Sequence, residues 1–180
     1  MAALFLLFVQ LTQTPSVAEL AALPMLVALR PVLPRNIDVP DKLRATFERL
    51  LEHSPTLTRQ CRRIGAAPHV RVVIRFAGQA ASLPRARASI TRYEAGALLA
   101  EIDLPISRDL IELLAHELEH VIEQMEGIKL ADLVREGEGR AYRDAAGVYE
   151  TQRAMLAGQM AATEMRQHTV LMAAANRRRF

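Results

Sequence analysis

The chain has 180 residues, which is the size of a single domain. Apolar residues make up 51% of it and charged residues 24%, without a long run of either sign, a composition that excludes collagen-like and disordered chains. The net charge of +3 is spread along the sequence, and the single cysteine, Cys61, excludes an internal disulfide or a cysteine-rich metal cluster.

The N-terminal residues resemble a secretory signal. Residues 3–9 are apolar, and Ser16-Val17-Ala18 has the small-x-small pattern of a cleavage site, which predicts removal of residues 1–18 from an exported protein, either periplasmic or secreted. The positively charged start of such signals is missing, so the alternative is a packed N-terminal helix in a cytoplasmic protein. No apolar run reaches the ~20 residues that a transmembrane helix needs. The remaining boundaries are predicted as a proline-punctuated segment over 19–40, the folded domain over 41–176 and a basic tail over 177–180.

Two helices and three strands are predicted in the first part of this domain. Asp41 is a suitable N-cap for a helix over 42–53, and a second helix follows over 56–64. Apolar and polar residues then alternate in three segments, which is the period of strands buried on one face. These strands are predicted over 70–76, 86–91 and 98–104, the last two joined by a turn at 94–96. Together they predict a small antiparallel sheet in an α+β domain.

Two features of this region bear on function. The arginines of the predicted strands are not interleaved with aromatic residues, which single-strand binders use to stack bases, so no nucleic-acid partner is expected. Cys61 stands among arginines that could lower the pKa of its thiol. A reactive thiol and a buried, inert one are both open interpretations.

The next helix carries a candidate metal site. Helix signals predict it over 107–127, because Ser107 can cap its start and Gly127 can end it. Within it, residues 116–120 read His-Glu-Leu-Glu-His. Two imidazoles four residues apart lie above one another on a helix, where both can bind one tetrahedral zinc ion, and Glu117 points toward the same cleft, where it can deprotonate a zinc-bound water. The alternative is a surface helix with two histidines, but the apolar stripe of this helix lies on the opposite side from His116 and His120.

This helix, with the strand before it, resembles the active-site helix of the zincin metallopeptidases, and the chain as a whole is similar to short bacterial proteins that carry the motif. The resemblance implies hydrolysis of peptide bonds in a peptide or protein substrate, with Zn²⁺ as cofactor, His116 and His120 as ligands and Glu117 as general base. It also implies that the edge strand before the helix, residues 98–104, aligns the substrate by strand addition. A zinc-binding or regulatory module of the same fold without catalytic turnover is the alternative.

The resemblance leaves the third zinc ligand open. The metzincin subclass needs Gly at position 123 and His at position 126, but both are Glu in this chain. The gluzincin-like subclass takes a Glu from a later helix, and the candidates are Glu136, Glu138 and Glu150.

Glu150 is the preferred third ligand and Glu138 the main alternative. We expect Glu150 near the start of a long C-terminal helix over about 145–175, on a face of small alanine side chains that lets another helix approach. Gluzincins often carry an acidic residue four positions after this Glu, where this chain has Ala154, so another group must orient a ligand histidine. Candidates for stabilising the oxyanion are Tyr142, Tyr149, Arg153 and His168.

Overall fold

The structure, a computed structural model, describes residues 32–76, 86–145 and 147–178. The chain divides into two units, Met1–Arg30 and Pro31–Phe180, and all described residues belong to the second. The predicted signal over 1–18 and most of the segment over 19–40 lie outside the described residues, as do the last two residues of the predicted tail.

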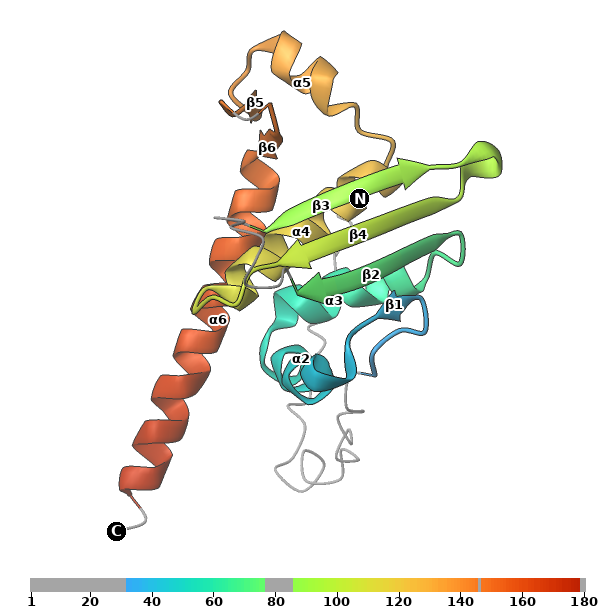
Figure 1. Ribbon diagram of the computed structural model, residues 1–180. Coiled ribbons are helices and arrows are strands. Elements are labelled where there is room, and N and C mark those ends of the chain that lie inside the picture. Colours follow the sequence, from blue (N-terminus) through green and yellow to red (C-terminus); the bar gives the residue numbers. More distant parts are fainter. Residues whose placement is uncertain (1–31, 77–85, 146, 179–180) are drawn as a thin grey trace, which may run out of the picture. The chain divides into compact units, whose positions relative to one another are not determined.

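Four strands form one mixed sheet, in the order β1-β2-β4-β3 (Figure 1). They are β1 (Ile37–Asp38), β2 (Val70–Phe76), β3 (Arg87–Arg92) and β4 (Leu98–Leu104). The positions of the three predicted strands are confirmed, but the expectation of an antiparallel sheet is wrong, because β2 runs parallel to both β1 and β4. Within this four-stranded sheet only β3 and β4, joined across a tight turn, are antiparallel.

The apolar content of the strands explains why the sheet has both parallel and antiparallel pairs. In β4 every second residue is buried, whereas β3 has an exposed arginine at each end. The sheet therefore gains most apolar burial when β4 lies in its interior, beside β2, and β3 takes the edge. The turn after β3 reverses the chain, so β4 runs antiparallel to β3 and parallel to β2. The expected role of residues 98–104 as an edge strand is thus wrong: among the described strands, β3 is the edge beside β4.

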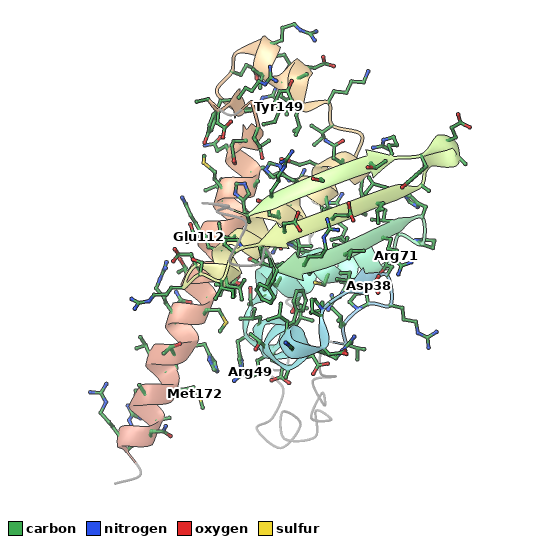
Figure 2. All side chains as sticks on the ribbon, viewed as in Figure 1. Asp38, Arg49, Arg71, Glu112, Tyr149 and Met172 are labelled. Carbon is green, nitrogen blue, oxygen red and sulfur yellow. The ribbon has the colours of Figure 1, made fainter. Side chains whose placement is uncertain are left out.

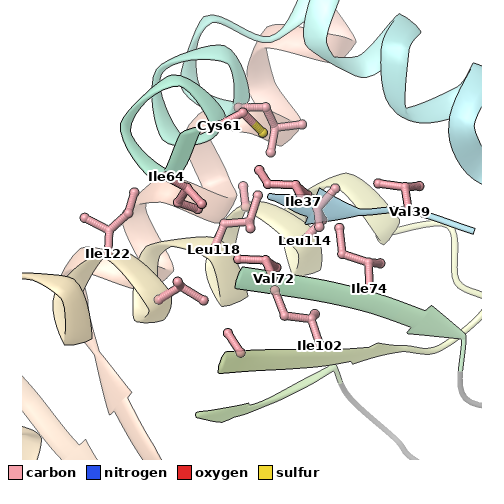
Figure 3. Close-up of a cluster of buried hydrophobic side chains, with 14 of the residues drawn as sticks. Ile37, Val39, Cys61, Ile64, Val72, Ile74, Ile102, Leu114, Leu118 and Ile122 are labelled. Atoms are coloured by element: carbon pink, nitrogen blue, oxygen red, sulfur yellow. The ribbon is translucent and has the colours of Figure 1, made fainter. Parts of the chain in front are cut away.

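Helices α2 (Asp41–His53), α3 (Pro55–Gly65) and α4 (Leu110–Met125) lie on one face of this sheet. Their apolar side chains and those of the strands form one buried cluster (Figure 3). Leu57, Val72, Ile102 and Leu118 are completely buried in it. On the other face, Arg75 pairs with carboxylates of β4, so this arginine is held in ion pairs of the sheet.

Helix α4 is shorter than predicted at its start. Ser107 does not cap it; instead, its hydroxyl accepts a hydrogen bond from the backbone N–H of Asp109, in the turn before the helix begins at Leu110. The predicted end is confirmed, because Gly127 follows the helix with a φ of +75°, a conformation that residues with a side chain rarely adopt.

The C-terminal part begins with α5 (Leu130–Glu136) and a two-stranded hairpin of β5 (Ala141–Arg143) and β6 (Tyr149–Thr151). The long C-terminal helix α6 covers Gln152–Arg177, so it starts about seven residues later than expected. The reason lies in the turn between the two strands, where the side chain of Asp144 accepts a hydrogen bond from the backbone of Val148. Gly147 in this turn has a φ of +83°, outside the helical region.

Helix α6 packs antiparallel against α4. Thr151, directly before α6, donates a hydrogen bond from its hydroxyl to Glu123 near the end of α4, while Gly158 of α6 lies against the backbone of Glu112 near the start of α4. Figure 2 shows Glu112 beside α6. Small buried side chains of α6 make this approach possible. They are Ala154, Ala157, Ala161 and Ala162. No helix among the described residues is long and apolar enough to cross a membrane.

Candidate metal centre

The structure brings His116, His120 and Glu150 together. The Nε2 atoms of the two histidines are 3.1 Å apart, and a carboxylate oxygen of Glu150 lies 2.9 Å from the Nε2 of His116 and 4.0 Å from that of His120. The two histidines lie one turn apart on α4, as the motif requires. Glu150 reaches them from β6, immediately before α6 packs on α4. These three residues form the only group of this kind among the described residues that could hold a metal ion.

The three atoms fit a tetrahedral metal ion. Two ligand atoms that share one zinc ion at ~2.0–2.1 Å lie about 3.3 Å apart. The three distances between the Nε2 atoms and the Glu150 oxygen bracket this value. The donor set of two imidazoles and one carboxylate is also the kind that catalytic zinc sites use, with a fourth position left for water or substrate.

The alternative third ligand, Glu138, lies elsewhere. Its side chain is 64% exposed and forms an ion pair with Arg140, 2.9 Å away, and Glu136 pairs with the same arginine. Glu150, in contrast, is only 9% exposed. The β5–β6 hairpin holds its backbone opposite that of Tyr142. The expectation that Glu150 belongs to the C-terminal helix is wrong, since it is the middle residue of a strand.

Glu117 lies next to the three candidate ligands and is only 6% exposed. Burial raises the pKa of its carboxyl group, and the nearby charge of Glu150 adds to this. The two histidines and a hydrogen bond with the backbone of Ala88 act in the opposite direction, but burial prevails. The contact with Ala88 places this carboxylate against the edge strand β3.

His120 is oriented by a residue that the sequence analysis did not assign to the site. Its Nδ1 atom lies 2.8 Å from the carboxylate of Glu123, whose other oxygen accepts a hydrogen bond of 2.7 Å from Thr151. Burial alone lowers the pKa of His120, but the hydrogen bond and charge of Glu123, with the charges of Glu117 and Glu150, outweigh it and raise the pKa. The available signal was the spacing: Glu123 stands three residues after His120, on the same side of the helix.

Two hollows flank Glu117. The larger, of about 370 Å³, lies between β3 and the β5–β6 hairpin and is lined by His120, Tyr149 and Arg87, among others. The smaller, of about 200 Å³, lies on the side of His116 and is lined by Tyr142. Glu117 and Glu150 line both hollows. An extended ligand could therefore pass the candidate metal centre on both sides.

The other residues considered for the site lie away from it. Arg153 donates its hydrogen bonds to Glu119 of α4 and to Glu126 just after that helix, and not to a candidate ligand. The ring of His168 stacks on that of His53, with centroids 3.6 Å apart. Cys61 is buried, and burial raises the pKa of its thiol to about 12, so the interpretation of Cys61 as a reactive thiol is not supported.

Comparisons of the chain with protein-family models, with curated proteins and with solved structures give no significant match. The candidate metal centre is therefore defined by its own residues: a group of two histidines and one glutamate, with a buried carboxylate beside it.

Proposed function

We propose that this protein is a zinc-dependent hydrolase of peptide bonds, similar to the zincin metallopeptidases of the gluzincin kind. The proposal is supported above all by one observation: the ligand atoms of His116, His120 and Glu150 converge at distances that suit one zinc ion, with Glu117 one residue along the helix. A closed structural zinc site would need a fourth protein ligand, and this group has three.

In the proposed reaction His116, His120 and Glu150 hold the metal. A bound zinc ion supplies Lewis acidity, which polarises a carbonyl and lowers the pKa of water. The carboxylate of Glu117 takes a proton from the attacking water and then gives it to the nitrogen of the leaving amine. The burial of Glu117 suits both steps, because it raises the pKa of the carboxyl group above its ordinary value and so makes the carboxylate a stronger base.

We propose that the substrate is an extended peptide and that β3 aligns it. Among the described residues, β3 is paired on one side only, and three of its residues, Arg87, Ala88 and Ile90, line the larger hollow. An extended peptide can hydrogen-bond to the open side of such a strand. Tyr142 and Tyr149, one at each hollow, remain the candidates for stabilising the oxyanion.

The first test is metal content. We expect purified protein to hold about one zinc ion per chain, as measured by emission spectrometry after zinc-replete purification. Glu150→Ala should bind zinc much more weakly than the wild type, because it loses one of three protein ligands, whereas Glu138→Ala, a matched change at an exposed glutamate, should bind it normally. If Glu138→Ala lost its zinc and Glu150→Ala kept it, Glu138 would be the third ligand, and the assignment to the β5–β6 hairpin would be wrong.

The second test is turnover. Glu117→Gln should keep its zinc and its fold, while cleavage of an unstructured protein substrate falls by ~10²–10⁴-fold, the usual effect of losing a general base. Chelator should abolish the wild-type activity, and added zinc should restore it. A zinc-loaded wild type that cleaves no faster than Glu117→Gln would favour the zinc-binding module without turnover.

A further inference from the structure

The environment of His120 extends beyond the four residues of the proposed site. Its Nδ1 atom faces the carboxylate of Glu123 at 2.8 Å, and its Nε2 atom faces Glu150 and His116. A carboxylate can only accept a hydrogen bond, so the proton of the neutral imidazole lies on Nδ1. The lone pair of Nε2 is then directed at the metal position.

Glu123 is held in turn by Thr151. The Thr151 hydroxyl donates to one oxygen of Glu123 at 2.7 Å and accepts from the backbone N–H of Ala154 at 3.0 Å, in the first turn of α6. A hydroxyl has one proton, so accepting from Ala154 leaves that proton for Glu123. Thr151 follows Glu150 directly in β6, and this short strand therefore supplies both a candidate ligand and the support for another.

The charge of Glu123 also needs an explanation. Three glutamates, Glu119 and Glu123 of α4 and Glu126 just after it, lie near the start of α6, and Glu119 and Glu126 pair with Arg153. Glu123 is only 1% exposed, and its carboxylate hydrogen-bonds with His120 and Thr151, while three arginines line the hollow beside it: Arg59, Arg140 and Arg153. A carboxylate buried in this way is costly unless a cation or a metal-bound group balances it.

We propose that Glu123 is a positioning residue of the metal centre: it fixes the tautomer and ring orientation of His120, so that Nε2 binds the metal, and Thr151 fixes Glu123. This inference rests on the metal centre proposed above but not on its catalytic turnover. Gluzincins often carry an acidic residue four positions after the ligand Glu, where this chain has Ala154. In the proposed centre, Glu123 takes over the orientation of a ligand histidine from that missing residue. Carboxylates that hydrogen-bond a ligand histidine in this way raise its basicity and tune metal affinity.

The experiment measures two quantities in each variant: the zinc dissociation constant, by competition with a chromophoric chelator, and the His120 tautomer of metal-free protein, by ¹⁵N NMR of the imidazole. Glu123→Gln should weaken zinc binding by ~10–100-fold and reduce the population of the tautomer protonated at Nδ1. Glu126→Gln is the matched control, since it removes a carboxylate just after the same helix that pairs with arginines. It should change neither quantity.

A second pair of variants tests the support of Glu123 without altering its charge. Thr151→Val keeps the shape of the side chain but loses the hydroxyl, and should weaken zinc binding in the same direction as Glu123→Gln. Thr151→Ser keeps the hydroxyl and should restore wild-type affinity. Wild-type affinity together with an unchanged His120 tautomer in Glu123→Gln would overturn the inference. Wild type that binds zinc but hydrolyses no peptide would overturn the proposed function alone.

Discussion

Gly158 marks the closest approach of α6 to α4 and allows a sharp test of this packing. A Cβ atom at position 158 would lie 2.7 Å from the backbone oxygen of Glu112 and 3.2 Å from a carbon of its side chain. The side chain of Glu112 can turn away, but its carbonyl oxygen is part of the α4 backbone. Gly158→Ala must therefore push the two helices apart.

The expected cost combines two opposing contributions. Alanine inside a helix is more favourable than glycine by about 0.5–1 kcal/mol, because glycine loses more conformational freedom on folding. Forcing an extra methyl group into a tightly packed contact costs about 1–3 kcal/mol. The net effect should be a loss of about 1–2 kcal/mol in the free energy of unfolding, or about 2–8 °C in Tm for a domain of this size. Zinc affinity should fall as well, because Glu150 lies just before α6.

Thermal and urea unfolding of metal-free protein measure the stability change, and chelator competition measures zinc affinity. The matched control is Gln167→Ala, an exposed position of the same helix, which should be neutral or slightly stabilising. A Gly158→Ala variant as stable as the wild type, with unchanged zinc affinity, would show that α4 and α6 do not approach this closely.

Three further expectations concern residues outside the metal centre. Because burial raises the pKa of Cys61 to about 12, a thiol reagent should label it slowly in native protein and rapidly in urea; fast labelling of native protein would contradict its burial. Glu164→Ala should cost about 1–3 kcal/mol by urea unfolding, because the Glu164 carboxylate accepts hydrogen bonds from the buried residues Ser54 and Thr56 at the start of α3; an unchanged midpoint would contradict this contact. The hydrogen bond from Arg153 lowers the pKa of Glu126 below its ordinary 4.5, so its contribution to stability is present above that pH and lost as the pH falls through the lowered value; wild type should lose more stability than Glu126→Gln over this range, and equal losses would count against the ion pair.

Much of the fold follows from local patterns in the sequence. The alternation in β2 and β4 predicted both strands with the bounds that the structure shows, because each strand buries one face. Helix α4 has its apolar stripe and its terminating Gly127, and these signals depend only on neighbouring residues. The direction of β4 relative to β2 was mispredicted, because pairing between strands distant in sequence depends on which strand buries more surface.

The candidate metal centre, too, could be predicted from the sequence only in part. His116, Glu117 and His120 lie within one helical turn, so the sequence alone indicates that they share a site. Glu150 was assigned to a helix on the pattern of small side chains around it, yet it lies in β6, where the turn through Gly147 prevents α6 from starting earlier. The contact of Glu123 with His120 depends on the rotamers of both side chains and on Thr151, which sequence spacing does not specify.

The side of β3 with which no described strand pairs has a consequence for how copies of this protein meet. An unpaired strand edge is a template on which two copies can join their sheets, which is a route to aggregation. If two copies of β3 (Arg87–Arg92) paired antiparallel over their full length, Arg87 of each would stand opposite Arg92 of the other, at both ends of the strand. Like charges directly opposite one another destabilise such a pair. An incoming peptide without arginines at these positions meets no such repulsion, so the substrate alignment proposed above is compatible with an edge that discourages pairing with a second copy.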